Sequence, residues 1–326
     1  MKHIGVLTSG GDAPGMNAAI RAVVRVAINS GLKVTGVLAG YQGLIQNDFI
    51  PLDSQSVRGI IQNGGTILRS ARSLEFRTEA GQKTAADNMK TAGMDALVVI
   101  GGDGTFRGAD SFSSRFAIPV VGVPGTIDND IYGTEYTIGY DTCLNTVVEA
   151  VDKIRDTASS HNRIFFVEVM GHESGFVAMH SGLACGAEAI LIPEQRNQLE
   201  KVRKFLSDRA CTNKSSVIMV AEGVEGGAMA IAEKMKVEFP QFEIKVSVLG
   251  HIQRGGSPSA RDRVLASELG AAAVHALLAD KSACMVGFLN GKLHHEAFST
   301  AVKMHKRINA DFIRMAESIG TYTPID

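Results

Sequence analysis

Short apolar runs alternate along the chain with longer segments in which apolar residues recur at helical spacing. The runs are nearly continuous in Val, Ile and Leu and end in Gly, Ser or Asp, which is typical of strands buried on both faces of a parallel sheet. A helical period covers residues 15–30, directly after the first run. The pattern predicts strands over residues 3–8, 32–39, 96–100, 118–123, 164–169, 189–192, 217–220 and 244–249.

The alternation of strands and helices predicts the α/β class, with right-handed crossovers between parallel strands. We expect the final helix over residues 300–319. Its start accounts for His294, His295 and Glu296 better than a metal cluster does. No linker rich in Pro or Ser divides the chain, and 326 residues suffice for one large or two moderate domains.

Composition narrows the function classes. Lys and Arg total 33 against 34 for Asp and Glu, so the chain lacks the basic excess of a nucleic-acid-binding protein. The four cysteines form no Cys-x-x-Cys pair, which argues against zinc and redox motifs and favours a reducing compartment. No apolar run reaches membrane-spanning length and no signal region opens the sequence, so we expect a soluble, cytoplasmic protein without a membrane partner.

Glycine-rich turns follow the predicted strands at residues 9–12, 101–104, 124–126 and 255–257. Ligands of open α/β sheets bind outside the carboxyl ends of the strands, so we expect these turns to face one cleft. In the turn 101–105, glycines would admit phosphate oxygens to backbone N–H groups at a helix N-terminus, and Asp103 could bind magnesium. A tight turn with an N-cap aspartate is the simpler alternative. The loop does not identify the phosphoryl donor, because lipid kinases and NAD kinases carry a similar one.

Two carboxylates, Asp128 and Asp130, follow the apolar strand 118–123 in the segment Pro124-Gly-Thr-Ile-Asp-Asn-Asp130. Phosphoryl transfer needs a base that accepts the hydroxyl proton and fixed charge that positions metal and phosphate. Asp128 suits the first role and Asp130 the second. The alternative is a solvated Asp-Asn-Asp turn, which explains the apolar strand and Thr126 poorly. The segment therefore favours a phosphoryl-transfer enzyme.

At this segment the sequence resembles the ATP-dependent 6-phosphofructokinases of bacterial type, and the resemblance covers essentially the whole chain. The motifs that carry it stand in the family's order: Gly10-Gly-Asp-Ala-Pro-Gly-Met-Asn17, Gly64-Gly-Thr66, Ser70-Ala-Arg72, Gly101-Gly-Asp-Gly104, Pro124-Gly-Thr-Ile-Asp-Asn-Asp130, Ser159-Ser-His-Asn-Arg163, Met170-Gly171, Ala221-Glu-Gly223 and Leu249-Gly-His-Ile-Gln-Arg-Gly-Gly-Ser257.

The resemblance implies two Rossmann-like, three-layer α/β/α domains with mostly parallel sheets and an active site in the cleft between them. A nucleotide-binding domain would comprise residues 1–138 and 251–300. A sugar-phosphate-binding domain would comprise residues 139–250 and 301–326. The implied reaction is glycolytic: the γ-phosphoryl group of ATP passes to the 1-hydroxyl of fructose 6-phosphate, giving fructose 1,6-bisphosphate and ADP with Mg²⁺ as cofactor.

The resemblance also implies roles for individual residues. Asp128 would be the base on the sugar hydroxyl, and the other catalytic residues would be Thr126, Asp130, Arg72 and Gly11. The residues implied to bind ATP are Gly11, Tyr41, Arg72, Ser73, Gly102, Asp103, Gly104, Thr105 and Gly108, with Asp103 on the metal. The residues implied to bind the sugar phosphate are Thr126, Asp128, Arg163, Met170, Gly171, His172, Glu222, Lys245, His251 and Arg254.

Two glycines bear on the choice of donor. Pyrophosphate-dependent relatives generally carry Asp at the position of Gly104 and Lys at that of Gly125, whereas glycine at both positions leaves room for the α-phosphate of a nucleotide. We therefore predict ATP as the donor. The alternatives are a pyrophosphate-dependent or relaxed sugar-phosphate kinase and a catalytically weak regulatory paralogue.

Two positions depart from the family's pattern. His172 stands where an Arg is usual, and a histidine is only partly charged near pH 7 and lacks the planar fork of Arg. Either His172 binds as an imidazolium, or Arg107 or Arg69 substitutes for the missing Arg, or His172 merely packs at the strand end. We expect a reduced or pH-sensitive rate. Lys245 stands where an Arg normally reaches the 6-phosphate from a neighbouring subunit, so weaker sugar-phosphate affinity is expected.

A regulatory site is also implied, in a homotetramer whose sites are shared between subunits. The family binds phosphorylated effectors such as ADP or phosphoenolpyruvate there, although Ser54 replaces an Arg that is common at its position. Without the resemblance, the i, i+4 pair on the first helix would indicate only a solvated stripe. The effector residues implied in this sequence are Arg21, Arg25, Arg155, Glu188 and Lys214.

Overall fold

The computed structural model describes residues 1–158, 163–209 and 215–321, and its contacts divide the chain into two compact units. Unit 1 comprises Met1–Ile127, Ile131–Thr142 and Arg254–Lys306, and unit 2 comprises Asp128–Asp130, Cys143–Gln253 and Arg307–Asp326. The units depart from the expected boundaries by a few residues. Residues 139–142 and 301–306, expected in the sugar-phosphate domain, belong to unit 1. Residues 128–130 and 251–253, expected in the nucleotide domain, belong to unit 2.

Unit 1 is built on a seven-stranded sheet in the order β11-β10-β5-β4-β1-β2-β3. The five central strands run parallel, and the outer pairs β2–β3 and β10–β11 are antiparallel. The strands are β1 (His3–Ser9), β2 (Lys33–Val37), β3 (Phe49–Leu52), β4 (Ala96–Gly101), β5 (Val120–Pro124), β10 (Cys284–Leu289) and β11 (Lys292–Ala297).

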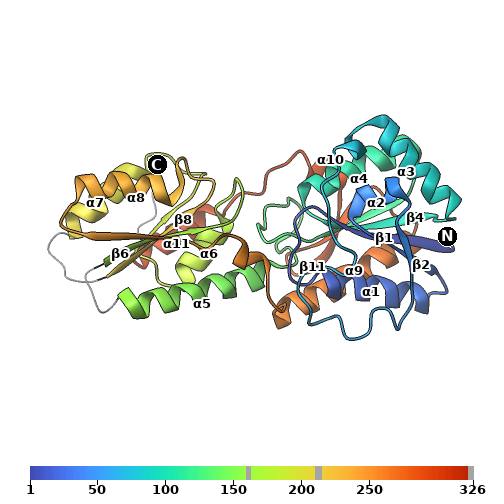
Figure 1. Ribbon diagram of the computed structural model, residues 1–326, viewed down its shortest axis with the longest axis horizontal. Helices are drawn as coiled ribbons and strands as arrows, with labels where there is room; N and C mark the ends of the chain where they lie inside the picture. Colours follow the sequence, from blue (N-terminus) through green and yellow to red (C-terminus); the bar gives the residue numbers. More distant parts are fainter. Residues whose placement is uncertain (159–162, 210–214, 322–326) are drawn as a thin grey trace. The chain divides into compact units, whose positions relative to one another are not determined.

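Helices cover both faces of this sheet (Figure 1), which makes unit 1 a three-layer α/β/α structure. All six residues of β4 are buried, as expected for a central strand between two helical layers. One face carries α1 (Met16–Asn29) and α9 (Ala260–Leu278). The other carries α2 (Gly40–Gln46), the 3₁₀ helix η1 (Glu75–Arg77), α3 (Glu79–Thr91), α4 (Asp103–Phe116) and α10 (Phe298–Ala301).

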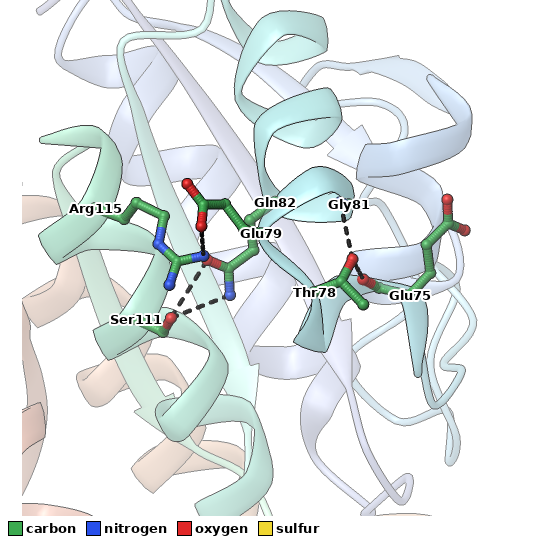
Figure 2. A network of polar contacts seen from close by, with 7 residues as sticks. All are labelled: Glu75, Thr78, Glu79, Gly81, Gln82, Ser111 and Arg115. Carbon is green, nitrogen blue, oxygen red and sulfur yellow. Dashed lines mark hydrogen bonds and ion pairs between the residues drawn. The ribbon is translucent and has the colours of Figure 1, made fainter.

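Polar contacts join α3 to α4 and fix the start of α3 (Figure 2). The backbone N–H of Gly81 donates to the Thr78 hydroxyl, which caps the helix at 3.1 Å. The amide of Gln82 is buried and lies 3.2 Å from the hydroxyl of Ser111 on α4. Glu79 on α3 and Arg115 on α4 form a weak ion pair, with 4.0 Å between Oε2 and Nη1. The Glu79 side chain is 80% exposed.

Unit 2 contains a four-stranded, fully parallel sheet in the order β7-β8-β6-β9. Its strands are β6 (Arg163–Val169), β7 (Ala189–Leu191), β8 (Ser216–Ala221) and β9 (Glu243–Val248). One face carries α7 (Gln198–Arg209) and α8 (Gly227–Glu238), and the other carries α5 (Tyr140–Ala158) and α6 (Phe176–Ala184) (Figure 1). The 3₁₀ helix η2 (Gly250–Arg254) follows β9, and α11 (Ala310–Ser318) stacks Phe312 on His180 of α6 at 4.5 Å.

The α/β class, the mostly parallel sheets and all eight expected strands are confirmed, with ends that shift by up to two residues. Three strands were not anticipated: β3, β10 and β11. The interpretation of His294–Glu296 as the start of the final helix is wrong, because these residues lie within β11. The single helix expected over 300–319 is wrong too. It is divided into α10 and α11, and Asn309 caps α11 by accepting the N–H of Asp311 at 2.8 Å.

The start of α5 is capped by a side chain from another helix. Asp262, on the first turn of α9, is 1% exposed and accepts the backbone N–H groups of Gly139 (3.0 Å) and Thr142 (2.8 Å) and the Thr142 hydroxyl (2.5 Å). Burial raises the pKa of Asp262, although the bonds from Thr142 and Gly139 oppose the shift. The carboxylate thus satisfies N–H groups that a helix cannot satisfy by itself.

Replacing Asp262 with Ala is expected to lower the free energy of unfolding by about 2–4 kcal/mol, because buried N–H groups lose their acceptor. Thermal unfolding would measure the loss. Because the folded-state pKa is raised, the advantage of the wild type should shrink as the pH rises above the ordinary carboxyl range. Glu79→Ala, at the exposed ion pair of Figure 2, is the control and should change stability by under about 0.5 kcal/mol. Equal losses in both variants would contradict a capping role.

Candidate active site

The carboxyl ends of three neighbouring strands bring three glycine-rich turns together. The strands β5, β4 and β1 are adjacent in the sheet, so the turns 124–126, 101–105 and 9–12 leave the same edge. The N–H of Gly125 donates to the carbonyl of Gly101 at 3.0 Å, and the Thr105 hydroxyl donates to the carbonyl of Ser9 at 3.0 Å. Three of the four turns that we expect to lie together therefore leave the same edge of the sheet.

The fourth glycine turn does not follow a strand as we expected, because η2 precedes it. The turn 255–257 packs against the loop 62–64. The Ser257 hydroxyl donates to the carbonyl of Gln62 at 2.7 Å. A Cβ added at Gly64 would lie 2.3 Å from the carbonyl oxygen of Gly256, so the two backbones approach more closely than any side chain allows. This turn therefore belongs to unit 1, although it was expected at the end of a strand.

The turn between β4 and α4 can accept phosphate groups. A Cβ at Gly101 would lie 2.4 Å from both the Ser9 carbonyl oxygen and the Thr105 hydroxyl, so the close packing of the turn requires glycine. Gly102 is the N-cap residue of α4 and Asp103 is its first helical residue, which excludes an N-cap aspartate. Apart from its chain neighbours and the backbone of its own helix, no heavy atom of the described residues lies within 4 Å of a Cβ added at Gly104. The start of α4 therefore presents backbone N–H groups beside open space.

Asp103 forms an i, i+4 ion pair with Arg107, whose Nε lies 2.7 Å from Oδ2. The Asp103 side chain is 41% exposed, so the carboxylate remains accessible at the surface of unit 1. Within the described residues, no group of three or more His, Cys, Asp or Glu side chains could hold a metal by itself. This donor set suits Mg²⁺, which commonly takes one or two carboxylates together with substrate phosphates and waters.

Other residues expected to contact the nucleotide lie close to this turn. Tyr41 is buried, stacks on Phe76 with ring centroids 4.0 Å apart, and donates its hydroxyl proton to the carbonyl of Thr105 at 2.6 Å. A Cβ at Gly108 would lie 2.9 Å from the Tyr41 ring, so glycine is needed there for packing. Tyr41 therefore supports the turn from inside the core. Burial raises the pKa of its phenol well above the ordinary value.

The segment from Thr66 to Ser73 closes over the end of β1. Arg69 adopts a left-handed conformation (φ 58°), and its carbonyl accepts the Thr8 hydroxyl at 2.6 Å. Ser70 donates to the carbonyl of Gly10. Arg72 is exposed, and the Ser73 hydroxyl donates to the side-chain oxygen of Gln42 at 2.6 Å. The guanidinium of Arg72 is thus carried on a segment that is anchored next to Gly11.

Arg254 lies over the first glycine turn. Its Nη1 donates to the carbonyl of Asp12 at 3.3 Å, and a Cβ at Gly11 would come within 2.4 Å of the same nitrogen. Glycine at position 11 therefore leaves the space that the guanidinium occupies. The sequence pattern does not indicate that Arg254 lies next to Gly11.

The segment Pro124–Asp130 passes from unit 1 into unit 2 after Ile127. Thr126 is buried, and its carbonyl accepts the Thr137 hydroxyl at 2.6 Å. Asn129 is also buried and left-handed (φ 54°), and Asp128 and Asp130 on either side are half-buried. The alternative of a solvated Asp-Asn-Asp turn is therefore wrong, because its central residue is 3% exposed.

In unit 2, residues expected at the sugar phosphate gather after β6 and β8. Met170 and Gly171 are buried, whereas His172 is exposed and left-handed (φ 54°). The carboxylate of Glu222, which follows β8, accepts the N–H groups of His172 (2.8 Å) and Gly171 (3.3 Å). The Ser174 hydroxyl lies 2.9 Å from the carbonyl oxygen of Gly171 and 3.4 Å from that of Asp128. Ser174 thus connects this loop with the backbone of Asp128.

The two expected phosphate cations of unit 2 share one carboxylate. Glu243 lies 2.8 Å from Nε of Arg163 and 3.0 Å from Nζ of Lys245. The hydrogen bond from Arg163, which is the larger cause, and the one from Lys245 lower the pKa of the Glu243 carboxyl to about 2. We did not anticipate Glu243. The alternation of a strand was a usable signal, because residues 243 and 245 share one face of β9.

The remaining expected residues divide between the two units. His251 is exposed on η2 in unit 2, and Arg21 and Arg25 are half-buried on α1 in unit 1. Arg155 lies 3.4 Å from Glu188, so these two implied effector residues form an ion pair in unit 2. Lys214 lies outside the described residues. None of the described helices combines the length and the apolar character that a membrane span requires.

Known proteins resemble the whole chain. A family model described as Phosphofructokinase matches residues 3–277. A protein of Bacteroides thetaiotaomicron named ATP-dependent 6-phosphofructokinase 2 is 52% identical over 322 residues, covering 98% of this chain and 99% of the relative. ATP-dependent 6-phosphofructokinase 1 of Thermus thermophilus is 53% identical over 322 residues, covering 98% of this chain and 100% of the relative.

A solved structure of phosphofructokinase from Saccharomyces cerevisiae is similar to both units. It matches with a TM-score of 0.87 and 35% identity over 99% of this chain. The match covers 47% of the yeast chain, so the present chain spans about half the length of that polypeptide.

Proposed function

The chain belongs to the phosphofructokinase family, and on that premise we propose how its residues transfer the γ-phosphoryl group of ATP to the 1-hydroxyl of fructose 6-phosphate. The reaction is that of an ATP-dependent 6-phosphofructokinase, a phosphotransferase of glycolysis. The observation that carries the mechanism is the half-buried Asp128, placed two residues after a threonine that packs on the phosphate-accepting turn.

ATP would bind along the edge formed by β1, β4 and β5. The turn 101–105 offers backbone N–H groups at the start of α4, and Gly104 leaves the space that a nucleotide phosphate needs. The exposed cation of Arg72 would neutralise the transferred group, with the guanidinium of Arg254, which occupies the space beside Gly11, as a second cation. Thr126 lies against this turn, since its Cβ is 3.6 Å from the position of a Cβ added at Gly102.

Asp128 would accept the proton of the sugar 1-hydroxyl as that oxygen attacks the γ-phosphorus. Asp130, two residues further on, would keep the local charge negative and favour a bound metal–phosphate group. Catalysis then rests on position and electrostatics, as is usual for phosphoryl transfer. Mg²⁺ held by Asp103 and the ATP phosphates would offset the charge that develops on the phosphate oxygens.

The sugar phosphate would be held by cations and by hydrogen bonds along its ring. Arg163, the first residue of β6, and Lys245, the third residue of β9, present two positive charges already oriented by Glu243. They lie away from the carboxyl ends of the strands, so we infer that they contact the 6-phosphate of a sugar bound by a neighbouring subunit. Glu222, His251 and the loop 170–172 would contact the sugar. An incoming phosphate must compete with Glu243 for these cations, and the bidentate geometry of an Arg is lost at Lys245. The proposal extends to a cytoplasmic homotetramer with a phosphorylated effector near Arg21, Arg25 and Arg155.

A steady-state assay with ATP, GTP and pyrophosphate against fructose 6-phosphate and tagatose 6-phosphate tests the function. We expect the highest kcat/KM for ATP with fructose 6-phosphate. Turnover with pyrophosphate and none with ATP would overturn the choice of donor. Comparable rates on both sugars would indicate a relaxed sugar-phosphate kinase. Binding of ATP and sugar phosphate without turnover would indicate a regulatory paralogue.

His172→Arg is expected to increase the rate above neutral pH and to flatten the pH–rate profile, because a guanidinium stays charged where an imidazole does not. The left-handed backbone at position 172 suits His better than Arg, so a small loss of thermal stability should accompany the exchange. The profile of kcat/KM for fructose 6-phosphate from about pH 6 to 9 measures the effect. The exposed His305→Arg serves as the control for a general gain of charge. Identical profiles for wild type and His172→Arg would contradict a charge role.

A further inference from the structure

Gln253 is a fully buried polar side chain and the last residue of the segment Cys143–Gln253 of unit 2. Its amide nitrogen donates to the carbonyl of Gly250 at 2.9 Å. Its amide oxygen accepts the backbone N–H of Met170 at 3.2 Å and lies 4.0 Å from the sulfur of Cys143. This side chain has no exposed surface and contacts two segments far from it in the sequence, at Met170 and Cys143, as well as the start of its own helix η2.

The segments that Gln253 joins carry residues to which the proposed function assigns the sugar phosphate. Met170 and Gly171 begin the loop after β6, whose N–H groups at positions 171 and 172 are held by Glu222. Gly250 begins η2, on which His251 is the next residue. The amide of Gln253 thus sets the distance between the 170–172 backbone and η2, whereas Glu222 holds the same loop from β8.

We propose that Gln253 is a positioning residue for the sugar phosphate, an inference that rests on the proposed function. It does not touch the substrate itself, because it is 0% exposed. It keeps the loop 170–172 and His251 in the relative position that the sugar requires. Both functional groups of the amide are used, so a residue that supplies only a donor or only an acceptor cannot replace it. Catalytic geometry is sensitive to small displacements of this kind.

The test is Gln253→Met, which keeps the length of the side chain and removes both hydrogen bonds. We expect the KM for fructose 6-phosphate to rise about tenfold, the equivalent of one lost hydrogen bond or slightly more. The KM for ATP should stay within about twofold, because unit 1 carries the ATP residues and keeps its contacts. Binding of fructose 6-phosphate, measured by calorimetry without ATP, should weaken by the same factor.

Gln82→Met is the matched control, because Gln82 is also a buried amide with side-chain hydrogen bonds and lies in unit 1 (Figure 2). It should lower thermal stability by a similar amount and leave both KM values unchanged. Gln253→Asn provides a second variant that keeps the amide but is one methylene too short to reach both partners. It should shift the KM for fructose 6-phosphate in the same direction.

The outcomes separate this inference from the proposed function. A wild type that does not phosphorylate fructose 6-phosphate defeats the function itself. An active wild type, together with folded Gln253 variants whose fructose 6-phosphate KM is unchanged, overturns the positioning role. A parallel rise of both KM values overturns it as well, since that pattern reports a general loss of structure. If neither Gln253 variant folds while Gln82→Met does, Gln253 is a determinant of folding and the inference is wrong.

Discussion

Asp128→Asn is expected to lower kcat by a factor of about 10²–10⁴, the usual contribution of a general base in proton transfer. The carboxamide keeps the size of the carboxylate but cannot accept the proton of the attacking hydroxyl. The backbone should be undisturbed, because the neighbouring Asn129 is buried and Thr126 is held through its carbonyl. Both KM values should stay within about threefold, since the lost interaction belongs to the transition state. A coupled aldolase assay measures both quantities.

The matched control is Asp110→Asn, which removes a half-buried carboxylate of α4 that has no assigned role. Its kcat should remain within about twofold of the wild type. If Asp128→Asn retains more than roughly a tenth of the wild-type kcat, Asp128 is not the base. If Asp110→Asn loses as much activity as Asp128→Asn, the loss is not specific to the carboxylate after β5.

Gly104→Asp is expected to reduce kcat/KM for ATP at least about 100-fold, because the new carboxylate would stand beside the nucleotide phosphates and repel them. The protein has room for the side chain, as no heavy atom of the described residues beyond the neighbouring residues and the backbone of α4 lies within 4 Å of the added Cβ. Thermal stability should therefore be close to that of the wild type. Initial rates with ATP and with pyrophosphate, over a range of each donor, measure the effect.

Gly104→Ala tests the effect of side-chain volume without added charge, because its methyl group would meet no described atom beyond the neighbouring residues and the backbone of α4. It should keep most of the ATP-dependent activity. Gly101→Ala, by contrast, places a Cβ 2.4 Å from the Ser9 carbonyl oxygen and should destabilise the protein. The proposed place of the donor would be untenable if Gly104→Asp used ATP as well as the wild type does.

Periodicity predicted the parallel strands of both sheets because strands such as β4 are apolar over their full length. It missed β3, which is four residues long and contains Pro51. It also missed the β10–β11 hairpin, although the sequence held a signal. Asn290 and Gly291 connect the two strands, both with positive φ, as the favoured two-residue hairpin turn requires.

The candidate site was predictable where a motif lies on one short loop, as at residues 101–105. It was not predictable where a side chain from a distant segment completes the site. The bond from Arg163 to Glu243 spans 80 positions and that from Gly139 to Asp262 spans 123, and a polar residue in the sequence does not reveal so distant a partner. The divided C-terminal helix was missed for a related reason: amphipathic spacing continues past residue 306, where the chain passes from unit 1 to unit 2.

The two outermost strands of the seven-stranded sheet have a consequence for behaviour in concentrated solution. Each is antiparallel to its neighbour and each carries residues that oppose further pairing: Pro51 in β3, which lacks an N–H, and Lys292 and Glu296 in β11. Edge strands with these residues pair poorly with the strands of another molecule. Newly made chains can therefore complete this domain at high local concentration with a reduced risk of amyloid-like association.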